Sequence, residues 1–356
     1  MSTQFLSSHC WYHQKGPMQE TVLYSRVRAL RNLQGHPFFL DSSSVGGRSL
    51  IQRFRESLDQ WDQQQSAQCY NLKDFSPLER RILLERQILE TGGSYKEFYP
   101  FFMGMDEALS GTLLGQDHLK MSCFRGGLDL KGAWEILKPL DEHLENDLQF
   151  AVSPQWGYLT CDPRQGGCGL KASVLMHLPG VEELDMVDRV YKTAESLGFS
   201  VRGFWGDGEG SLGDLYQISN QVSAGFSPQE ILEGTHLLAE KIHRIETRAR
   251  ESVFQKRRNQ LEDKVWRAYG KLKYARQIGY QEALSVLSSL RFGAIVGILK
   301  GVDPHRLSMM FYQVQKGHLA GELGQELEQG DERSYDFERV LWMQRHLGLL
   351  QGDENV

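Results

Sequence analysis

The segment VRGFWGDGEGSLGDLYQISNQVSAG, residues 201–225, places a glycine-rich turn between two short runs of apolar and polar residues typical of strands. A similar run, GYLTC at 157–161, lies upstream and is also followed by glycines. Between these regions and the N-terminal third lies a helical stretch, GAWEILKPLDEHLEND at 132–147. Strands and helices interleaved in this way predict an α/β or α+β domain between about residues 100 and 225.

The length of 356 residues exceeds what one small core accommodates and predicts two domains. A net charge of −6 argues against a protein that coats nucleic acid or an anionic membrane, although a local site needs only a few cations. The N-terminus lacks the apolar region of a secretory signal, and the apolar stretch 292–299 is too short to cross a bilayer. These features predict a cytoplasmic protein without a membrane span.

From about residue 228 the sequence becomes helical. Apolar side chains recur every three or four residues and form one stripe, made of Leu238, Ile242, Ile245, Ala249 and Val253. Shorter helical segments follow to the C-terminus, separated by glycines and by Asp303-Pro304. The pattern predicts a C-terminal helical bundle.

The segment LYSRVRALRNL, residues 23–33, carries Arg26 and Arg28 two positions apart. On an extended strand the two side chains point to the same side, where they can grip one anion. Arginine suits this task because its planar guanidinium pairs two phosphate oxygens at once. Alternating arginines are also common on exposed strands, so the pair alone is weak support for a phosphate site.

Three further segments support the interpretation of Arg26 and Arg28 as a phosphate site. They are GQDHLKMSCFRGGLDL (115–130), GYLTCDPRQGGCGLKASVLMHLPGV (157–181) and the segment 201–225. In order and spacing they resemble the ATP:guanido phosphotransferases, whose blocks read SSRxR, NEEDHxR, CPTNxGTGLRAS and RGxxGEG followed by YQISNQ. The helical segments 261–278 and 282–302 resemble the C-terminal domain of the protein-arginine kinases, a branch of that family.

The resemblance implies an α+β fold, in which an antiparallel sheet is flanked by helices and followed by a C-terminal helical domain. It implies a mainly helical N-terminal part (1–95), a sheet-containing catalytic domain (96–255) and a regulatory or dimerising helical domain (256–356). The implied reaction is transfer of the ATP γ-phosphate, with Mg²⁺, to arginine side chains of proteins. The implied partners are a zinc-binding adaptor, a Clp protease and a second copy of the chain in a homodimer, with no nucleic acid.

Several positions match the nucleotide-binding residues of the family, although two of them carry lysine where the family has arginine. The residues that the resemblance assigns to ATP binding are Ser25, Arg26, Arg28, His118, Lys120, Lys171, Ala172, Ser173, Arg202, Gly203 and Gly206. The substitutions Lys120 and Lys171 exchange a bidentate fork for a point charge. No separate protein-held metal site is expected.

The positions that match the reaction chemistry depart further from the family. A guanidinium has a pKa above about 12, so a carboxylate must orient it and accept its proton. Gln116 stands where the family has the guanidinium-binding glutamate, and Asp162 stands where it has a cysteine, next to Cys161. Asp207 replaces the glutamate of RGxxGEG with a shorter carboxylate, and Arg164 replaces a threonine.

Two interpretations of these changes stay open. In one, the site is rebuilt: Asp162 and Asp207 form the carboxylate pair beside Gln116, with Glu209 in reserve, and Arg164 supplies a phosphate contact. In the other, the chain is an inactive pseudokinase or scaffold that binds nucleotide or partners without transferring phosphate. A single sequence does not separate the two.

The family's C-terminal domain also binds phosphoarginine through an RDxxRA motif. The matching stretch here is YDFERV, residues 335–340, which keeps Asp336 and Arg339 but replaces the leading arginine with Tyr335. The resemblance therefore assigns Asp336 and Arg339 to phosphoarginine binding, and an ordinary helix start explains the stretch equally well.

Overall fold

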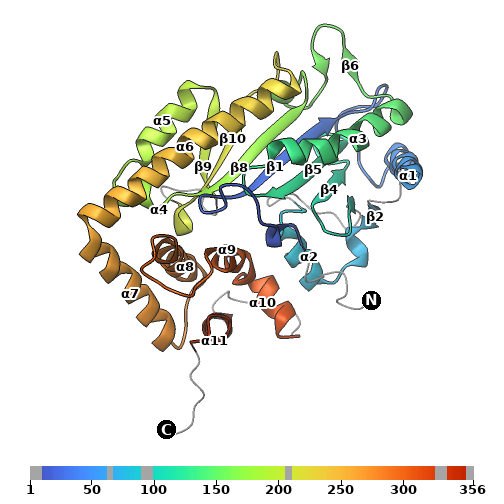
Figure 1. Cartoon of the computed structure of the whole chain (residues 1–356). Coiled ribbons are helices and arrows are strands. Elements are labelled where there is room, and N and C mark those ends of the chain that lie inside the picture. Colours follow the sequence, from blue (N-terminus) through green and yellow to red (C-terminus); the bar gives the residue numbers. More distant parts are fainter. Residues whose placement is uncertain (1–9, 62–66, 90–98, 205–210, 325–334, 350–356) are drawn as a thin grey trace.

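The computed structural model describes residues 10–61, 67–89, 99–204, 211–324 and 335–349. Within these ranges eight strands form one sheet in the order β2-β3-β4-β5-β1-β8-β10-β9 (Figure 1). Every neighbouring pair of strands is antiparallel, which confirms the expected sheet. The strands of this sheet are β1 (Val22–Arg31), β2 (Gln68–Asn71), β3 (Pro100–Met103), β4 (Leu109–Leu113), β5 (Leu119–Gly126), β8 (Leu170–His177), β9 (Phe199–Gly203) and β10 (Leu215–Asn220).

A short hairpin, β6 (Val152–Ser153) and β7 (Gly157–Tyr158), projects from the sheet (Figure 1). The helices fall into those that accompany the sheet and those of the C-terminal region. The first group is α1 (Val45–Gln60), α2 (Pro77–Glu85), α3 (Leu130–Leu148), α4 (Pro179–Glu183), α5 (Val187–Ser196) and α6 (Pro228–Lys256). The second group is α7 (Arg258–Tyr274), α8 (Tyr280–Ile295), α9 (Pro304–Gln313), α10 (Lys316–Glu322) and α11 (Asp336–His346).

One face of the sheet is covered by helices, with α3 and α6 lying across it (Figure 1). Apolar side chains of alternate strand residues, such as Val27 in β1 and Val174 in β8, form a continuous core with these helices. The predicted stripe of α6 faces this core: Leu238 and Ile242 are buried, and Ile245 packs at its margin. The helix begins at Ser227, which forms a capping box with the third helical residue.

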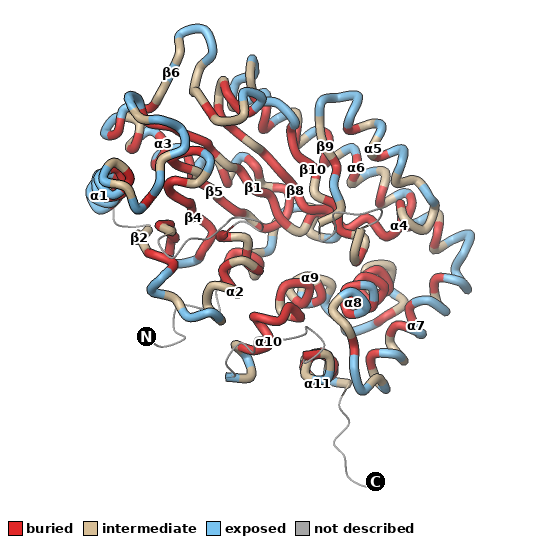
Figure 2. The backbone as a smooth tube through the Cα atoms, turned by 180° about the vertical axis from the view of Figure 1, so that it is seen from behind, coloured by how far each residue is buried: buried red, intermediate tan, exposed pale blue. Residues whose placement is uncertain are grey.

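The other face of the sheet meets the C-terminal helices at one end. Tyr24 of β1, Phe124 of β5 and Leu175 of β8 belong to a second core that includes residues of α7 to α11. Trp11, from the N-terminal segment, stacks on Phe124 with ring centroids 4.2 Å apart. Figure 2 shows the buried strands from this side, with the C-terminal helices gathered below them. The predicted C-terminal helical region is therefore present, and it packs directly on the sheet.

The N-terminal part differs from a separate helical layer. It contributes α1 and α2, but it also contributes β2 at the edge of the sheet and β1 at its centre. The reason is that β1 is hydrogen-bonded on both sides, to β5 and to β8, and is buried along most of its length. A boundary at residue 95 therefore does not coincide with a break in the sheet, and the division into 1–95, 96–255 and 256–356 stays a prediction.

Candidate functional site

A group of cationic side chains gathers on the sheet face away from α6. Arg26 and Arg28 alternate with apolar residues in β1 and so point to this face, as the sequence predicts. In the register between β1 and β8, Arg28 lies opposite Lys171 and Arg26 lies opposite Ser173. Three predicted nucleotide contacts are thus brought beside one another by strand pairing alone, with the hydroxyl of Ser173 next to them.

The electrostatics of Lys171 show how closely these charges meet. Burial, followed by the positive charges of Arg28, Arg202 and Arg26 in that order, lowers the pKa of Lys171 to about 8. Asp162 opposes the shift with the smallest contribution. Like charges destabilise one another unless an anion joins them. We call Arg26, Arg28, Lys171 and Arg202 the cation cluster.

The margins of the cluster come from neighbouring strands. Arg202 lies in β9, is exposed, and is followed by Gly203 at the end of that strand. Lys120 lies in β5 opposite Leu30 of β1, on the same side of the sheet as Arg28. The structure therefore places both predicted basic contacts around the central pair.

Gln87 is a neighbour of the cluster that the sequence did not reveal. Its side-chain Oε1 accepts a hydrogen bond from Arg26 Nη1 at 3.3 Å and another from the Tyr24 hydroxyl at 3.1 Å. Arg26 is 8% exposed, and its guanidinium carbon lies 5.2 Å from the centroid of the Phe124 ring. Nothing in the helical stretch around Gln87 distinguishes this residue from other surface glutamines, because its partners lie about sixty residues away.

The residues assigned to the guanidinium lie on two loops that are hydrogen-bonded together. Asp117 accepts hydrogen bonds from Asn32 Nδ2 at 2.6 Å and from the Cys161 backbone N–H at 2.8 Å. The Cys161 thiol donates to the backbone oxygen of Gln116 at 2.8 Å. Gln116 itself is exposed. Gln116 and Asp162, the residue after Cys161, are therefore brought to the same region from different parts of the chain.

Asp162 is an ionised carboxylate held by its neighbour. Its Oδ2 lies 3.0 Å from Arg164 Nη2, and its Oδ1 accepts from Arg164 Nε at 3.1 Å. These hydrogen bonds hold the pKa of Asp162 below its usual range, and Lys171 adds a smaller electrostatic effect in the same direction. Arg164 in this arrangement pairs with Asp162, which differs from the phosphate contact expected of it.

The Cys161 thiol is protonated at neutral pH. Burial and, to a smaller extent, the Asp117 carboxylate raise the pKa of this thiol to about 11. A thiol in this state is a poor nucleophile and a poor base. The cysteine beside Asp162 therefore does not take over ionic chemistry at this position.

His118 has a structural role in the described fold. It is completely buried; its Nδ1 accepts from the Leu33 backbone N–H at 3.0 Å, and its Nε2 donates to the Pro37 carbonyl at 2.7 Å. Burial lowers the pKa of His118, so the ring is neutral with its proton on Nε2. Both ring nitrogens are occupied, which leaves none for the predicted contact with ATP.

Two other predicted contacts point to the helix-covered face. The Ser25 hydroxyl donates to the Gly127 carbonyl at 2.8 Å and accepts from the Asp129 backbone N–H at 2.9 Å. The side chain of Ala172 lies in the core beneath α6. Both residues support the strands that carry the cation cluster and do not line it. Asp207 and Gly206, with Glu209, lie outside the described residues.

The predicted phosphoarginine residues sit at the start of α11. Arg339 is fully buried and donates to the carbonyls of Val314 and Ile278, each at 2.9 Å. It also pairs with the Asp336 carboxylate at 2.5 Å. In the described structure Arg339 joins three helical segments, and its guanidinium is turned inward, so phosphoarginine binding by this pair stays a prediction.

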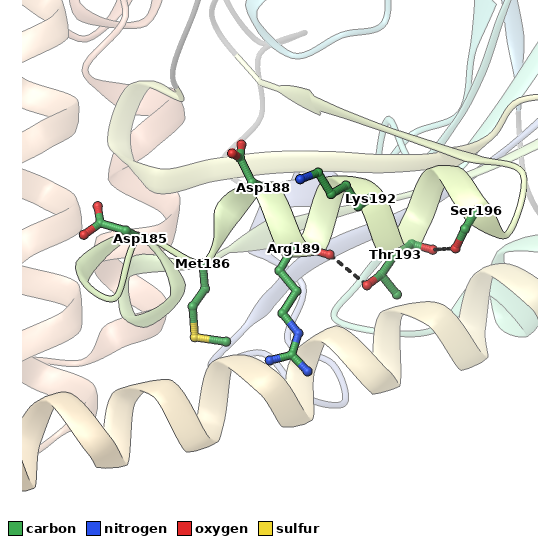
Figure 3. A pocket seen from close by; sticks show the side chains of 7 residues that line it. All are labelled: Asp185, Met186, Asp188, Arg189, Lys192, Thr193 and Ser196. Atoms are coloured by element: carbon green, nitrogen blue, oxygen red, sulfur yellow. Dashed lines mark hydrogen bonds between the residues drawn. The ribbon is translucent and has the colours of Figure 1, made fainter.

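An open groove runs along α5 (Figure 3). Its lining is Asp185, Met186, Asp188, Arg189, Lys192, Thr193 and Ser196. Asp185 and Met186 precede α5, the other five residues lie on it, and the side chains point in different directions, as Figure 3 shows. None of them belongs to the predicted site. The groove does not present converging groups for chemistry.

The described part of the chain contains no helix with the length and apolar composition that a membrane span requires. No group of three or more His, Cys, Asp or Glu side chains in these ranges could hold a metal ion.

The chain is similar to known proteins along most of its length. Residues 49–249 match the C-terminal catalytic domain of ATP:guanido phosphotransferases, and residues 258–355 match the C-terminal domain of the protein-arginine kinase McsB. Similar proteins named protein-arginine kinase include one from Pelotomaculum thermopropionicum, 34% identical over 89% of this chain and 90% of that protein. Another, from Bacillus subtilis, is 32% identical over 97% of this chain and 96% of its own.

Solved structures resemble the fold. The duplicated taurocyamine kinase of Schistosoma mansoni, with transition-state analogue components bound, matches with a TM-score of 0.58 and 20% identity, over 66% of this chain and 34% of that one. A lombricine kinase matches with a TM-score of 0.56 and 19% identity, over 67% of this chain and 69% of that one. At these identities the likeness concerns the fold.

Proposed function

Because the chain belongs to the ATP:guanido phosphotransferases, in the branch of the protein-arginine kinases, we propose that it transfers the γ-phosphoryl group of ATP to arginine side chains of proteins. The observation that carries the proposal is the cation cluster, in which Arg26, Arg28 and Lys171 meet on adjacent strands. A polyphosphate is the ligand whose charge such a cluster suits.

The described residues fit an anionic ligand. Buried donors without a hydrogen-bond partner in the described structure include Arg26 Nε and Gln87 Nε2. Leaving such donors unsatisfied costs about 1–3 kcal/mol each, which a phosphate oxygen would recover. Arg26, Arg28, Lys171 and Arg202 would hold the phosphates. Mg²⁺ would arrive on those phosphates and offset their charge during transfer.

The transfer step needs a base for the guanidinium. In the proposed reaction an Nη–H of the substrate arginine gives its proton to a carboxylate as that nitrogen bonds to the γ-phosphorus. The bond from the γ-phosphorus to the β–γ bridging oxygen breaks, and ADP leaves. Asp162 is ionised at neutral pH and lies near Lys171, so it can orient the guanidinium. Asp207 is the second proposed carboxylate, and Gln116 can hydrogen-bond but cannot accept the proton.

The alternative is a protein that binds nucleotide without transferring phosphate, because Gln116 lacks the family's carboxylate. The identity of 32–35% to proteins named protein-arginine kinase, along most of the chain, favours the kinase. With this function go the expected partners: protein substrates that carry arginine, a zinc-module adaptor, a Clp protease and a second copy of the chain. A cytoplasmic location belongs to the same proposal.

Transfer of labelled phosphate tests the proposal. The full-length protein is mixed with Mg²⁺, γ-labelled ATP and an arginine-rich protein, with and without the adaptor. We expect label on the substrate that acid removes, as for a phosphorus–nitrogen bond. The variant Arg28→Ala should lose this label, whereas Arg48→Ala, at an exposed position of α1, should keep it. Nucleotide binding by the wild type without any acid-labile label would support the binding-only alternative.

A further inference from the structure

The C-terminal end of α2 carries three consecutive side chains that contact three different parts of the molecule. Glu85 accepts hydrogen bonds from the backbone N–H groups of Gly317 at 2.8 Å and His318 at 3.0 Å, in α10. Arg86 pairs with the buried carboxylate of Glu107, in the turn between β3 and β4. Gln87, the next residue, reaches the cation cluster.

The orientation of the Gln87 amide follows from its partners. The Arg26 guanidinium can only donate, so the atom of Gln87 that faces Arg26 Nη1 must be the acceptor Oε1. The Tyr24 hydroxyl donates to the same oxygen. The amide nitrogen Nε2 therefore points elsewhere, and it is buried without a hydrogen-bond partner in the described structure. A buried amide donor left in this way calls for an acceptor, and a ligand oxygen can supply one.

The backbone holds Gln87 in this place. Its φ is +59°, in the left-handed region that a residue with a side chain seldom adopts. The turn is fixed on both sides: the Trp11 indole donates to the Arg86 carbonyl at 2.9 Å, and the Gln87 backbone N–H donates to the Leu84 carbonyl at 3.0 Å. Such a conformation persists only where surrounding contacts impose it.

We propose that Gln87 is a residue of the nucleotide site that both positions Arg26 and binds phosphate, a role that rests on the function proposed above. Its Oε1 holds the Arg26 guanidinium in place, and its Nε2 donates a hydrogen bond to the same phosphate group that Arg26 binds. Arg26 is otherwise supported by the face of Phe124, which fixes its plane less strictly than a hydrogen bond does. The ligand class is the phosphate chain of a nucleoside di- or triphosphate.

The position also links the site to the helical region. Because Glu85 and Gln87 belong to one turn, the contact with α10 and the contact with Arg26 are two residues apart. The turn that places Gln87 beside Arg26 is therefore also the turn that contacts α10.

Calorimetric titration of the full-length protein with MgADP and MgATP tests the role of Gln87. We expect Gln87→Ala to weaken binding of both nucleotides by about tenfold, since a lost hydrogen bond to a charged group is of that order. Gln87→Glu should weaken it more, because its carboxylate pairs with Arg26 and repels phosphate. Gln52→Ala, at an exposed glutamine of α1, should bind like the wild type.

The readouts separate positioning from general damage. Positioning predicts a raised KM for ATP with an unchanged melting temperature, whereas a purely structural role predicts a lowered melting temperature. If Gln87→Ala does not fold, the near-isosteric Gln87→Glu decides. Wild-type affinity in a folded Gln87→Glu protein would overturn the role of Gln87 and leave the nucleotide site standing. A wild type that binds neither nucleotide would instead overturn the function on which the role rests.

Discussion

Lys171 is the member of the cation cluster whose charge depends on pH in the working range. An arginine side chain keeps its charge at any ordinary pH. Burial and the neighbouring arginines, in contrast, bring the pKa of Lys171 to about 8. The family carries an arginine here, so the substitution to lysine replaces a permanent charge with one that can be lost. The exchange of arginine for lysine keeps the sign of the charge, but it makes that charge depend on pH.

We expect nucleotide affinity to fall as pH rises from 7 to 9. In this window Lys171 releases its proton in the free protein, and the cluster loses one positive charge toward the phosphates. A bound polyphosphate favours the protonated form, so the affinity loss is gradual. Lys171→Arg should bind equally at both ends of the range, and Lys171→Met should be weak throughout. Calorimetry across the range measures this, and a wild type as flat as Lys171→Arg would contradict it.

The lowered pKa of Lys171 also makes the stability of the folded protein depend on pH. The pKa of Lys171 is lower in the folded protein than in the unfolded chain, so between about 8 and 10.5 the unfolded chain binds more protons. Stability from this residue therefore rises with pH across that window. Burial of a cation beside other cations is a cost of the site, and deprotonation relieves it.

Gln116 is the residue at which the rate of transfer should be most open to improvement. We expect Gln116→Glu to raise the single-turnover rate of arginine phosphorylation by at least about tenfold, because a positioned base contributes 10²–10⁴-fold. Gln155→Glu, which adds the same charge at the exposed tip of the β6-β7 hairpin, should leave the rate unchanged. No gain from Gln116→Glu would contradict this expectation and would mean that a third carboxylate adds nothing to the proposed pair Asp162 and Asp207.

At the level of elements, the end of α2 acts as a clamp between the sheet and α10. Burial alone would raise the pKa of Glu85, but His318, the Gly317 N–H and Arg81 outweigh it and hold the pKa below its usual range. His318 is neutral because burial lowers its pKa; it donates from Nδ1 to Glu85 and accepts from Arg86 at Nε2. The described partners of the buried Glu85 carboxylate all donate hydrogen bonds to it.

We expect Glu85→Ala to lower the free energy of unfolding by about 3–5 kcal/mol, because it leaves buried donors of α10 without their acceptor. Glu56→Ala, at an exposed position of α1, should change it by less than about 0.5 kcal/mol. Because the folded pKa of Glu85 is depressed, its contribution is present above pH 4.5 and is lost as the pH falls through the folded value. Urea denaturation measures both effects; equal stabilities of the two variants would contradict the clamp.

At the scale of the whole molecule, the sheet and the helical region form one structure through a buried polar network. Arg291 of α8 donates to the carbonyls of Gln19 at 2.7 Å and Glu20 at 3.0 Å, just before β1. It also donates to His177 Nδ1 at 2.6 Å, at the end of β8. The strands that carry the cation cluster, β1 and β8, are therefore both anchored to α8.

We expect Arg291→Met to destabilise the protein by about 3 kcal/mol or more, because buried carbonyls and a histidine nitrogen lose their donor. Arg345→Met, on the exposed side of α11, should have little effect. Thermal unfolding monitored by circular dichroism compares the two. A melting temperature of Arg291→Met equal to that of Arg345→Met would show that the network does not join the two regions.

The sequence was sufficient to predict part of the site, and the contacts above explain why it did not predict the rest. Strand parity was enough to predict that Arg26 and Arg28 lie on one face. The family resemblance assigned Lys171 to the same ligand, and the structure places it opposite Arg28. The enclosed role of His118 could not be foreseen, because it depends on partners about eighty residues away. The role of Gln87 could not be predicted for the same reason. Its position depends on a left-handed turn and on a contact with β1, and the helical pattern around it indicates neither.

The most direct test of the central claim is phosphorus NMR of the full-length protein with MgATP and an arginine-rich protein, with the adaptor present. If the cation cluster holds ATP for transfer to arginine, a phosphoramidate signal grows as the ATP signals fall, and Arg28→Ala abolishes it. ATP signals that persist unchanged, in a sample where calorimetry shows the nucleotide bound, would contradict the account.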